Sequence, residues 1–322
     1  MSKATVMLLV VVVLAVWLLR RDRRTTVEQF ASGPDSIFVS IPSYRDTACI
    51  ATLKNMFDNA THPTRVIAGL CVQTTGTGAE SCLPRGFKHH ANVRIIKIPH
   101  TEAQGPTHAR KLIGDLYLDE TWFLGIDSHT RFSKGWDVEL VRQIRELPPD
   151  SVLSHYPPAW DYKDTESVPI ICKVKFDENG APAHVATRLP AGTHYRTPYI
   201  GCNFVFGPGP IAALYESISH LWIPEEFFLS AKLFTHGYDV YTPSKNVLSH
   251  FYERKGQVRW HDDIKNWWDF QGPALARTMA RLDPDNATFG PKRTLREFYD
   301  FCGIDMRQKK LLPSAERFCT QK

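Results

Sequence analysis

The chain has 322 residues, of which 43% are hydrophobic and 23% are charged, and its formal net charge is +5. This composition predicts one large α/β domain or two closely joined halves, and it excludes a disordered chain. Residues 1–24 carry +4 of the net +5 charge, so the remainder of the chain is nearly neutral. A nucleic-acid-binding protein spreads a basic face over its folded part, so that class is excluded as well.

Residues 4–19 form an apolar run that ends at the basic cluster 20–24. Sixteen helical residues span about 24 Å, slightly less than the hydrocarbon core of a bilayer. Residues 1–3 and the arginines extend that span by snorkelling. The run predicts a single membrane anchor over residues 1–24, followed by a short stem over residues 25–35. A cleaved signal peptide is the rival explanation, but arginines rather than small residues follow the run.

The orientation of this anchor stays open between a Golgi or ER lumenal domain and a cytosol-facing one. The basic flank on its C-terminal side favours a cytosolic domain under the positive-inside rule. Glycosylation sequons at residues 59–61 and 286–288 fit a lumenal domain instead. The seven cysteines include no CxxC pair, which argues against a zinc ribbon or a thioredoxin-type site. A bridge between Cys71 and Cys82 fits a lumenal domain, although buried thiols are the more common explanation.

Beyond the stem, apolar strand-like segments alternate with segments of helical spacing. Pro42 is expected to end the first strand, and Thr47 is expected to cap the helix that follows. This alternation is typical of a mostly parallel sheet covered by helices, in which ligands bind at the carboxyl ends of the strands. We expect strands over residues 36–41, 65–73, 93–98, 121–126, 199–206, 240–241 and 247–251, and helices over residues 48–59, 107–118 and 225–235.

Asp127 and His129 come directly after the strand expected over residues 121–126. Side chains at positions i and i+2 of an extended chain point the same way, so this carboxylate and this imidazole converge. The carboxylate suits Mg²⁺ or Mn²⁺, and the imidazole favours Mn²⁺. A cation there is the Lewis acid that a departing diphosphate requires. An isolated D-x-H sequence is more often a turn cap beside an ordinary histidine, and the preceding strand is what favours the metal site.

Several sequence blocks, in their order and spacing, resemble the GlcNAc-transferases that modify hydroxyproline on a cytosolic ubiquitin-ligase subunit. The D-x-H sequence is similar to the metal motif of GT-A-type glycosyltransferases. The resemblance implies an α/β GT-A-type fold, a Rossmann-like mixed sheet, over residues 36–322. Within it, residues 36–132 would bind a nucleotide sugar and residues 133–322 the acceptor. The blocks are residues 37–46, 105–110, 126–132, 135–137, 225–226 and 235–239, within a match from about 37 to about 252.

The resemblance also implies roles in donor binding for five residues. Ser40, Pro42, Arg45 and Asp46 lie at the end of the first strand, where the nucleotide base and ribose would sit. Arg110 would contact the donor diphosphate or sugar, near a helix start whose N–H groups favour anions. A surface ion pair is an equally good explanation of Arg45.

Related D-x-H transferases take a third metal ligand from the C-terminal half of the chain. His250 follows another apolar segment, and it is the candidate to join Asp127 and His129. His236 is the competitor, but its surroundings are typical of a helix end, with Gly237 as the C-cap. A lone histidine is more often a structural residue than a ligand.

Glu225 and Glu226 are the candidate catalytic residues. Acidic residues in a first helical turn also complement the helix dipole, which is the purely structural explanation. The functional explanation places a carboxylate, foremost Glu226, near the acceptor hydroxyl or the reacting carbon of the sugar. The family is thought to retain anomeric configuration, so no dedicated general base is required. Pro224 stands where the family pattern has glycine, and the aromatic segment 260–268 either stacks on sugars or an acceptor peptide or packs in the core.

The sequence therefore predicts a Mn²⁺-dependent (or Mg²⁺-dependent) glycosyltransferase that moves a sugar, GlcNAc from UDP-GlcNAc, to a protein hydroxyl or a glycan. Its expected partners are the UDP-sugar donor, the acceptor and a membrane. No nucleic acid is expected to bind. A membrane anchor is not expected of the cytosolic relatives, which leaves the acceptor open. One alternative is a metal-dependent phosphoester hydrolase, whose usual ligand motifs such as HExxH are missing. The other is a catalytically silent, membrane-tethered carbohydrate-binding module, which would have a broken metal site.

Overall fold

The computed structural model describes residues 35–253 and 256–321. The predicted membrane anchor and almost all of the predicted stem lie outside these residues. Within them, no helix combines the length and the apolar character that crossing a bilayer requires.

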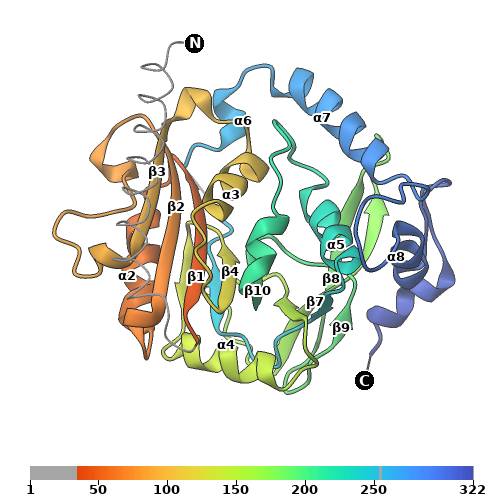
Figure 1. Cartoon of the computed structure of the whole chain (residues 1–322), viewed down its shortest axis with the longest axis horizontal. Helices are drawn as coiled ribbons and strands as arrows, with labels where there is room; N and C mark the ends of the chain where they lie inside the picture. Colours follow the sequence, from red (N-terminus) through yellow and green to blue (C-terminus); the bar gives the residue numbers. More distant parts are fainter. Residues whose placement is uncertain (1–34, 254–255, 322) are drawn as a thin grey trace, which may run out of the picture.

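An eight-stranded mixed sheet forms the centre of the fold (Figure 1). Its strands are β1 (Ile37–Tyr44), β2 (Val66–Thr74), β3 (Val93–Pro99), β4 (Trp122–Ile126), β6 (Ser151–Ser154), β9 (Arg196–Thr197), β10 (Phe204–Pro208) and β11 (Asp239–Tyr241). They lie in the order β3-β2-β1-β4-β10-β6-β11-β9. The first four of these are parallel neighbours, whereas β10 runs antiparallel to both β4 and β6. The parallel strands β1 and β2 are buried along nearly their whole length, which explains their almost unbroken apolar sequences.

Helices cover both faces of this sheet, and successive side chains of β1 point to opposite faces. Ile37, Val39 and Ile41 pack with α2 (Cys49–Asn59) and α4 (Trp136–Arg145) on one face. Phe38 packs on the other face, in a cluster to which α3 (Pro106–Gly114) and α5 (Glu225–Thr235) contribute.

Smaller elements surround the sheet. A long hairpin joins β7 (Ser167–Phe176) to β8 (Pro182–Pro190), and β12 (Leu248–His250) pairs antiparallel with β5 (Thr130–Phe132). Figure 1 shows α7 (Trp267–Arg281) arching over the molecule between α6 (Trp260–Asp263) and α8 (Leu295–Cys302). A two-stranded ladder of β13 (Ile304–Asp305) and β14 (Lys310–Leu311) follows α8. A separate hydrophobic cluster joins α5, α7 and α8.

Two predictions about the end of the first strand are wrong. Pro42 does not end β1, which continues to Tyr44. Beyond Ser40 only one side of β1 is paired, because the pairing with β4 stops there, and such an edge-like position tolerates proline. Thr47 is not the cap of the next helix, since α2 begins after Ala48, whose N–H donates to Asp46 Oδ1 at 2.8 Å.

Two further segments are shorter than expected. The helix expected over residues 107–118 ends at Gly114, which lies so close to another segment that a Cβ would be 2.8 Å from the Ala212 carbonyl oxygen. Of the strand expected over residues 199–206, only the part from Phe204 onward is extended, and residues before it form a turn with an isolated bridge between Gly201 and Phe204.

The bridge considered between Cys71 and Cys82 is absent from the described residues, and Cys71 is a buried free thiol, as the more common explanation had it. Cys82 is bonded to Cys49, and a second disulfide joins Cys172 to Cys319. These partners are 33 and 147 residues apart, so nothing in the local spacing could reveal them. The remaining cysteines of the described residues are buried free thiols, namely Cys71, Cys202 and Cys302.

Candidate active site

A cavity of about 530 Å³ opens at the edge of the sheet where the parallel strands end. Its wall includes residues from the ends of β1 and β2, from the segment after β4, from the starts of α3 and α5, from β8 and from the segment that enters α6. The carboxyl ends of parallel strands are where open α/β sheets bind ligands, as the sequence predicted.

Three potential metal ligands converge beside this cavity. One ligand atom each from Asp127, His129 and His250 lies within 4.8 Å of the other two. His250 Nε2 is 3.0 Å from Asp127 Oδ2, and His129 Nε2 is 3.9 Å from the same oxygen. The pairing of β12 with β5 causes this convergence, because it places His250 opposite Thr130, the residue after His129. The set of one carboxylate and two imidazoles fits a divalent transition metal such as Mn²⁺.

Asp46 lies behind His129 and does not line the cavity. Its Oδ2 is 2.7 Å from His129 Nδ1 and accepts a hydrogen bond from Ser128 Oγ at 2.6 Å. A carboxylate that binds one ring nitrogen of a histidine orients the other nitrogen toward a metal. The carboxylate of Asp46 is fully buried and faces His129, and the predicted contact of this residue with the nucleotide stays a prediction.

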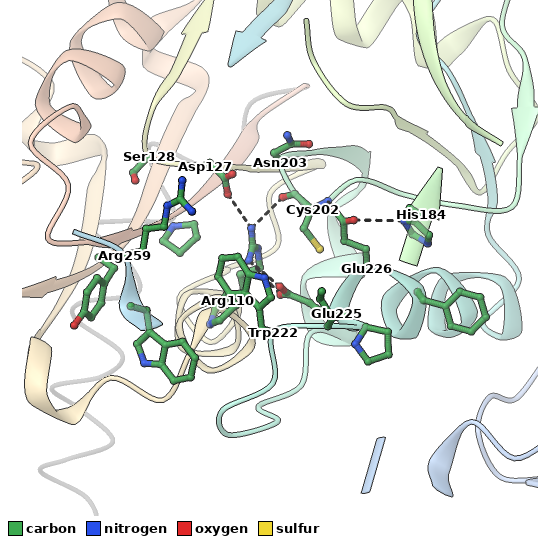
Figure 2. A pocket seen from close by; sticks show the side chains of 18 of the residues that line it. Arg110, Asp127, Ser128, His184, Cys202, Asn203, Trp222, Glu225, Glu226 and Arg259 are labelled. Atoms are coloured by element: carbon green, nitrogen blue, oxygen red, sulfur yellow. Dashed lines mark hydrogen bonds and ion pairs between the residues drawn. The ribbon is translucent and has the colours of Figure 1, made fainter. Parts of the chain in front are cut away.

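Arg110 links the potential metal ligands to the start of α5. Its Nη2 donates to Asp127 Oδ1 at 2.9 Å and to the Cys202 carbonyl oxygen at 3.3 Å. Its Nη1 donates to Glu225 Oε1 at 3.1 Å. Arg110 is buried on α3, which begins after Gly105, a residue with φ of 92° that favours glycine. Figure 2 shows the guanidinium between the two carboxylates.

The buried charges shift the pKa values of this group strongly. Burial acts to lower the pKa of Arg110, but Glu225 and Asp127 raise it above its ordinary value. Burial acts to raise the pKa of Asp127, but the hydrogen bond with His250 and the charge of Arg110 hold it well below its usual range. Burial raises the pKa of Glu225 to about 7, with Arg110 opposing and the neighbouring Glu226 adding to the rise. The site thus holds a permanent cation between a permanent anion and a carboxyl group that titrates near neutrality.

Glu226 occupies the opposite side of the first turn of α5. Its Oε1 accepts a hydrogen bond from the Cys202 N–H at 2.9 Å, and its Oε2 accepts one from the Tyr156 hydroxyl. His184 Nδ1 lies 3.4 Å from Glu226 Oε2. Pro224, which departs from the family pattern, follows a cis peptide bond and occupies the N-cap of α5.

The remaining candidates from the sequence divide between the cavity and other positions. Pro42 lines the cavity, but Ser40 is buried within β1 and does not. Arg45 makes ion pairs with Glu80 at 3.4 Å and Asp263 at 2.7 Å, which is the surface alternative that the sequence had left open.

The contacts of His236 lie at the C-terminal end of α5 and not at the proposed metal ligands. It is the C-cap of α5, and its Nδ1 lies 2.8 Å from the Lys232 carbonyl oxygen. His250, and not His236, therefore joins Asp127 and His129.

Sequence reasoning missed several polar or charged residues on the cavity wall, and four of them come from distant parts of the chain. No local motif marks them, because the end of β6, the hairpin β7–β8 and two loops bring them together only in the folded chain. The aromatic segment 260–268 reaches the cavity at Trp260. The four residues are Tyr156, His184, Asn203 and Arg259.

Comparison with protein families finds one match. A family model described as "Glycosyltransferase (GlcNAc)" matches residues 36–89 and 79–284. No curated protein matches the sequence.

Solved glycosyltransferase structures share the fold. The structure of GalNAc-T7 with UDP, GalNAc and Mn²⁺ superposes with a TM-score of 0.55 at 13% identity, covering 82% of this chain and 54% of that one. The mannosyltransferase PcManGT from Pyrobaculum calidifontis, in complex with GDP-Man and Mn²⁺, gives 0.50 at 15% identity, covering 92% and 80%. The chain therefore spans about half of the GalNAc-T7 chain. The likeness confirms the predicted GT-A-type mixed sheet.

Proposed function

The chain belongs to the glycosyltransferase (GlcNAc) family, and from this premise we propose that it is a metal-dependent enzyme that transfers GlcNAc from UDP-GlcNAc to a hydroxyl group of a protein or a glycan. The observation that carries the proposal is the convergence of Asp127, His129 and His250 within 4.8 Å beside the cavity. This donor set suits Mn²⁺ better than Mg²⁺, which prefers oxygen ligands. A volume of about 530 Å³ is also within the usual range of small-molecule sites.

The chain's own residues supply distinct parts of the reaction. Asp127, His129 and His250 would hold the ion, which when bound supplies a Lewis acid for the diphosphate leaving group. Arg110 adds a buried positive charge on the same side, held in place by Asp127 and Glu225. Glu226 is held by the Cys202 N–H and the Tyr156 hydroxyl. This carboxylate lines the cavity, and its proposed role is to contact the transferred sugar or the acceptor hydroxyl.

The ligands of the structural neighbours support the class of donor. The GalNAc-T7 structure holds UDP, GalNAc and Mn²⁺, and the PcManGT structure holds GDP-Man and Mn²⁺. A nucleotide sugar and Mn²⁺ are accordingly proposed for this chain too. GlcNAc as the transferred sugar rests on the family match and on the sequence resemblance.

Isothermal titration of UDP-GlcNAc and of UDP into the purified full chain, with and without Mn²⁺, tests the proposal. We expect both ligands to bind only when Mn²⁺ is present. We expect His250→Ala to abolish this Mn²⁺-dependent binding. His236→Ala is the matched control, because His236 lies at the far end of α5 and should leave binding unchanged. If UDP binds and UDP-GlcNAc does not, the donor carries another sugar. If folded protein binds neither, the proposal is overturned.

A further inference from the structure

His184 is a buried histidine on the cavity wall that lacks hydrogen bonds. Its side chain is only 1% exposed, and among the described residues neither ring nitrogen has a hydrogen-bond partner. The ring packs near the rings of Tyr199 and Phe227, with centroid distances of 4.9 Å and 6.3 Å. Buried polar groups in native proteins nearly always have a partner, and the place of this imidazole on the cavity wall leaves its nitrogens available to a ligand.

Glu226 lies close to one of the two ring nitrogens of His184 without meeting the geometry of a hydrogen bond. Glu226 Oε2 lies 3.4 Å from Nδ1, as the dashed line in Figure 2 shows. The carboxylate itself is fixed by the Cys202 N–H and the Tyr156 hydroxyl. A carboxylate next to Nδ1 favours the tautomer that carries its proton there, which leaves Nε2 as a hydrogen-bond acceptor.

Asn203 provides a second acceptor without a partner on the same wall. The residue is buried, with 8% of its surface exposed, and its Oδ1 makes no hydrogen bond with any described residue. Asn203 directly follows Cys202, whose N–H binds Glu226. The groups around Glu226 are therefore hydrogen-bond acceptors that require donors.

The two ends of the cavity thus have opposite chemistry. Arg110 and the proposed metal ligands favour the anionic diphosphate, which carries no hydrogen-bond donors. His184, Asn203 and Glu226 favour a group that has O–H donors, as a sugar ring does. Consecutive contacts from Asp127 to Arg110 and on to Glu225, the neighbour of Glu226, connect the two ends. The sugar attached to the diphosphate is accordingly the ligand that reaches both.

We propose that His184 contacts the transferred sugar and accepts a hydrogen bond from one of its hydroxyl groups through Nε2. The nearby Glu226 carboxylate favours the required tautomer of the imidazole, and Asn203 accepts from a second donor of the same sugar. This inference rests on the proposed function, because it assumes that the cavity binds a nucleotide sugar.

His184→Phe tests the inference, because phenylalanine keeps the packing against Tyr199 and Phe227 and removes both nitrogens. With Mn²⁺ present, we expect the Kd of UDP to stay within about twofold and that of UDP-GlcNAc to rise about tenfold, as loss of one hydrogen bond predicts. His184→Gln, which restores an acceptor, should recover most of the affinity. His89→Phe is the matched control, because His89 also packs on a phenylalanine, Phe57 at 4.6 Å, and has an unpartnered Nε2, but does not line the cavity.

Deoxy analogues of UDP-GlcNAc identify the contacted hydroxyl. The analogue that lacks it should bind wild-type protein about tenfold more weakly than UDP-GlcNAc does. The His184→Phe variant should bind this analogue and UDP-GlcNAc with equal affinity. The inference is overturned if His184→Phe weakens UDP and UDP-GlcNAc equally, or if it changes neither. Failure of the wild-type protein to bind UDP with Mn²⁺ would instead overturn the proposed function.

Discussion

At the scale of single residues, Asp46 controls how His129 is presented to the candidate metal site. Its Oδ2 binds the His129 ring at 2.7 Å from a fully buried position. Asp46→Asn should weaken Mn²⁺ binding about 10- to 100-fold, the usual effect of losing such a supporting carboxylate. Titration calorimetry with Mn²⁺ measures this directly.

Asp137→Asn provides the comparison for that measurement. Asp137 is also buried, but its two oxygens accept hydrogen bonds from the Thr61 and His62 N–H groups at 2.8 Å, away from the cavity. Its substitution should affect stability and leave the Mn²⁺ affinity intact. Equal loss of Mn²⁺ affinity in both variants would show that Asp46 acts only through the fold.

Glu225 makes the stability of the protein depend on pH. Burial raises its pKa from 4.5 to about 7, so the folded state holds this proton more tightly than the unfolded state does. The free energy of unfolding should therefore fall as pH rises from 4.5 to about 7, with no further contribution above that range. The glutamine of Glu225→Gln does not titrate, so the variant lacks this pH-dependent contribution to the free energy of unfolding. Its stability relative to wild type should thus rise across the window by about 1–3 kcal/mol.

Urea denaturation at several pH values, in EDTA so that no metal binds, measures this difference. Glu139→Gln is a control with the opposite sign, because the hydrogen bond with Arg142 lowers the pKa of Glu139. That glutamate stabilises the protein above its unfolded pKa, and the contribution is lost as pH falls. A flat profile for Glu225→Gln relative to wild type would contradict the raised pKa.

At the scale of elements, the packing of α3 on the sheet depends on Gly69 of β2. A Cβ there would lie 2.3 Å from Phe38 Cζ and 2.8 Å from Ile113 Cγ2, which belong to β1 and α3. Gly69→Ala should therefore destabilise the protein by about 1–3 kcal/mol through overpacking. Chemical denaturation measures the loss, and the displacement of α3 should also weaken UDP binding, since α3 carries Arg110.

Gly78→Ala separates overpacking from a general effect of losing a glycine. No atom lies within 4 Å of the position that its Cβ would take. Its effect should stay within about 0.5 kcal/mol, as for other surface substitutions. A similar loss of stability in both variants would rule out the close approach of α3 as the cause.

The sequence predicted those elements whose side-chain pattern is local. The buried strands β1, β2 and β4 have continuous apolar sequences, and α5 shows helical spacing over the whole range that the structure gives it. The hairpin β7–β8 was not predicted from the sequence, because its burial pattern depends on elements far along the chain. His184 was missed for the same reason, whereas Asp127 and His129 were found because a strand directly precedes them.

At the scale of the whole molecule, two disulfides bear on where the domain resides. Bridges of this kind persist in oxidising compartments and are rare in the cytosol. We therefore predict that the domain faces the lumen, against the orientation that the basic flank alone favours. The predicted anchor over residues 1–24 remains part of this proposal.

Thiol labelling of the protein from cells tests that orientation. Alkylation after denaturation without reduction should label only the three cysteines that are free in the structure. After reduction, all seven should react. Glycosidase digestion tests whether the sequons at residues 59–61 and 286–288 carry glycans, because loss of a glycan changes the mobility of the protein on a gel. Labelling of all seven cysteines without reduction, together with no mobility change on digestion, would place the domain in the cytosol.

The central sheet passes without a break from the first half of the chain into the second. β10 pairs antiparallel with β4, and β12 pairs antiparallel with β5, so strands from both sides of residues 132–133 share hydrogen-bonded ladders. The cavity likewise takes its wall from Pro42 through Trp260. A chimera that joins residues 36–132 of one relative to the later residues of another would therefore have to re-form both ladders and the metal-ligand set across its junction. Point changes on the cavity wall, or exchange of the hairpin β7–β8, leave these shared ladders intact and are therefore the more direct way to change specificity.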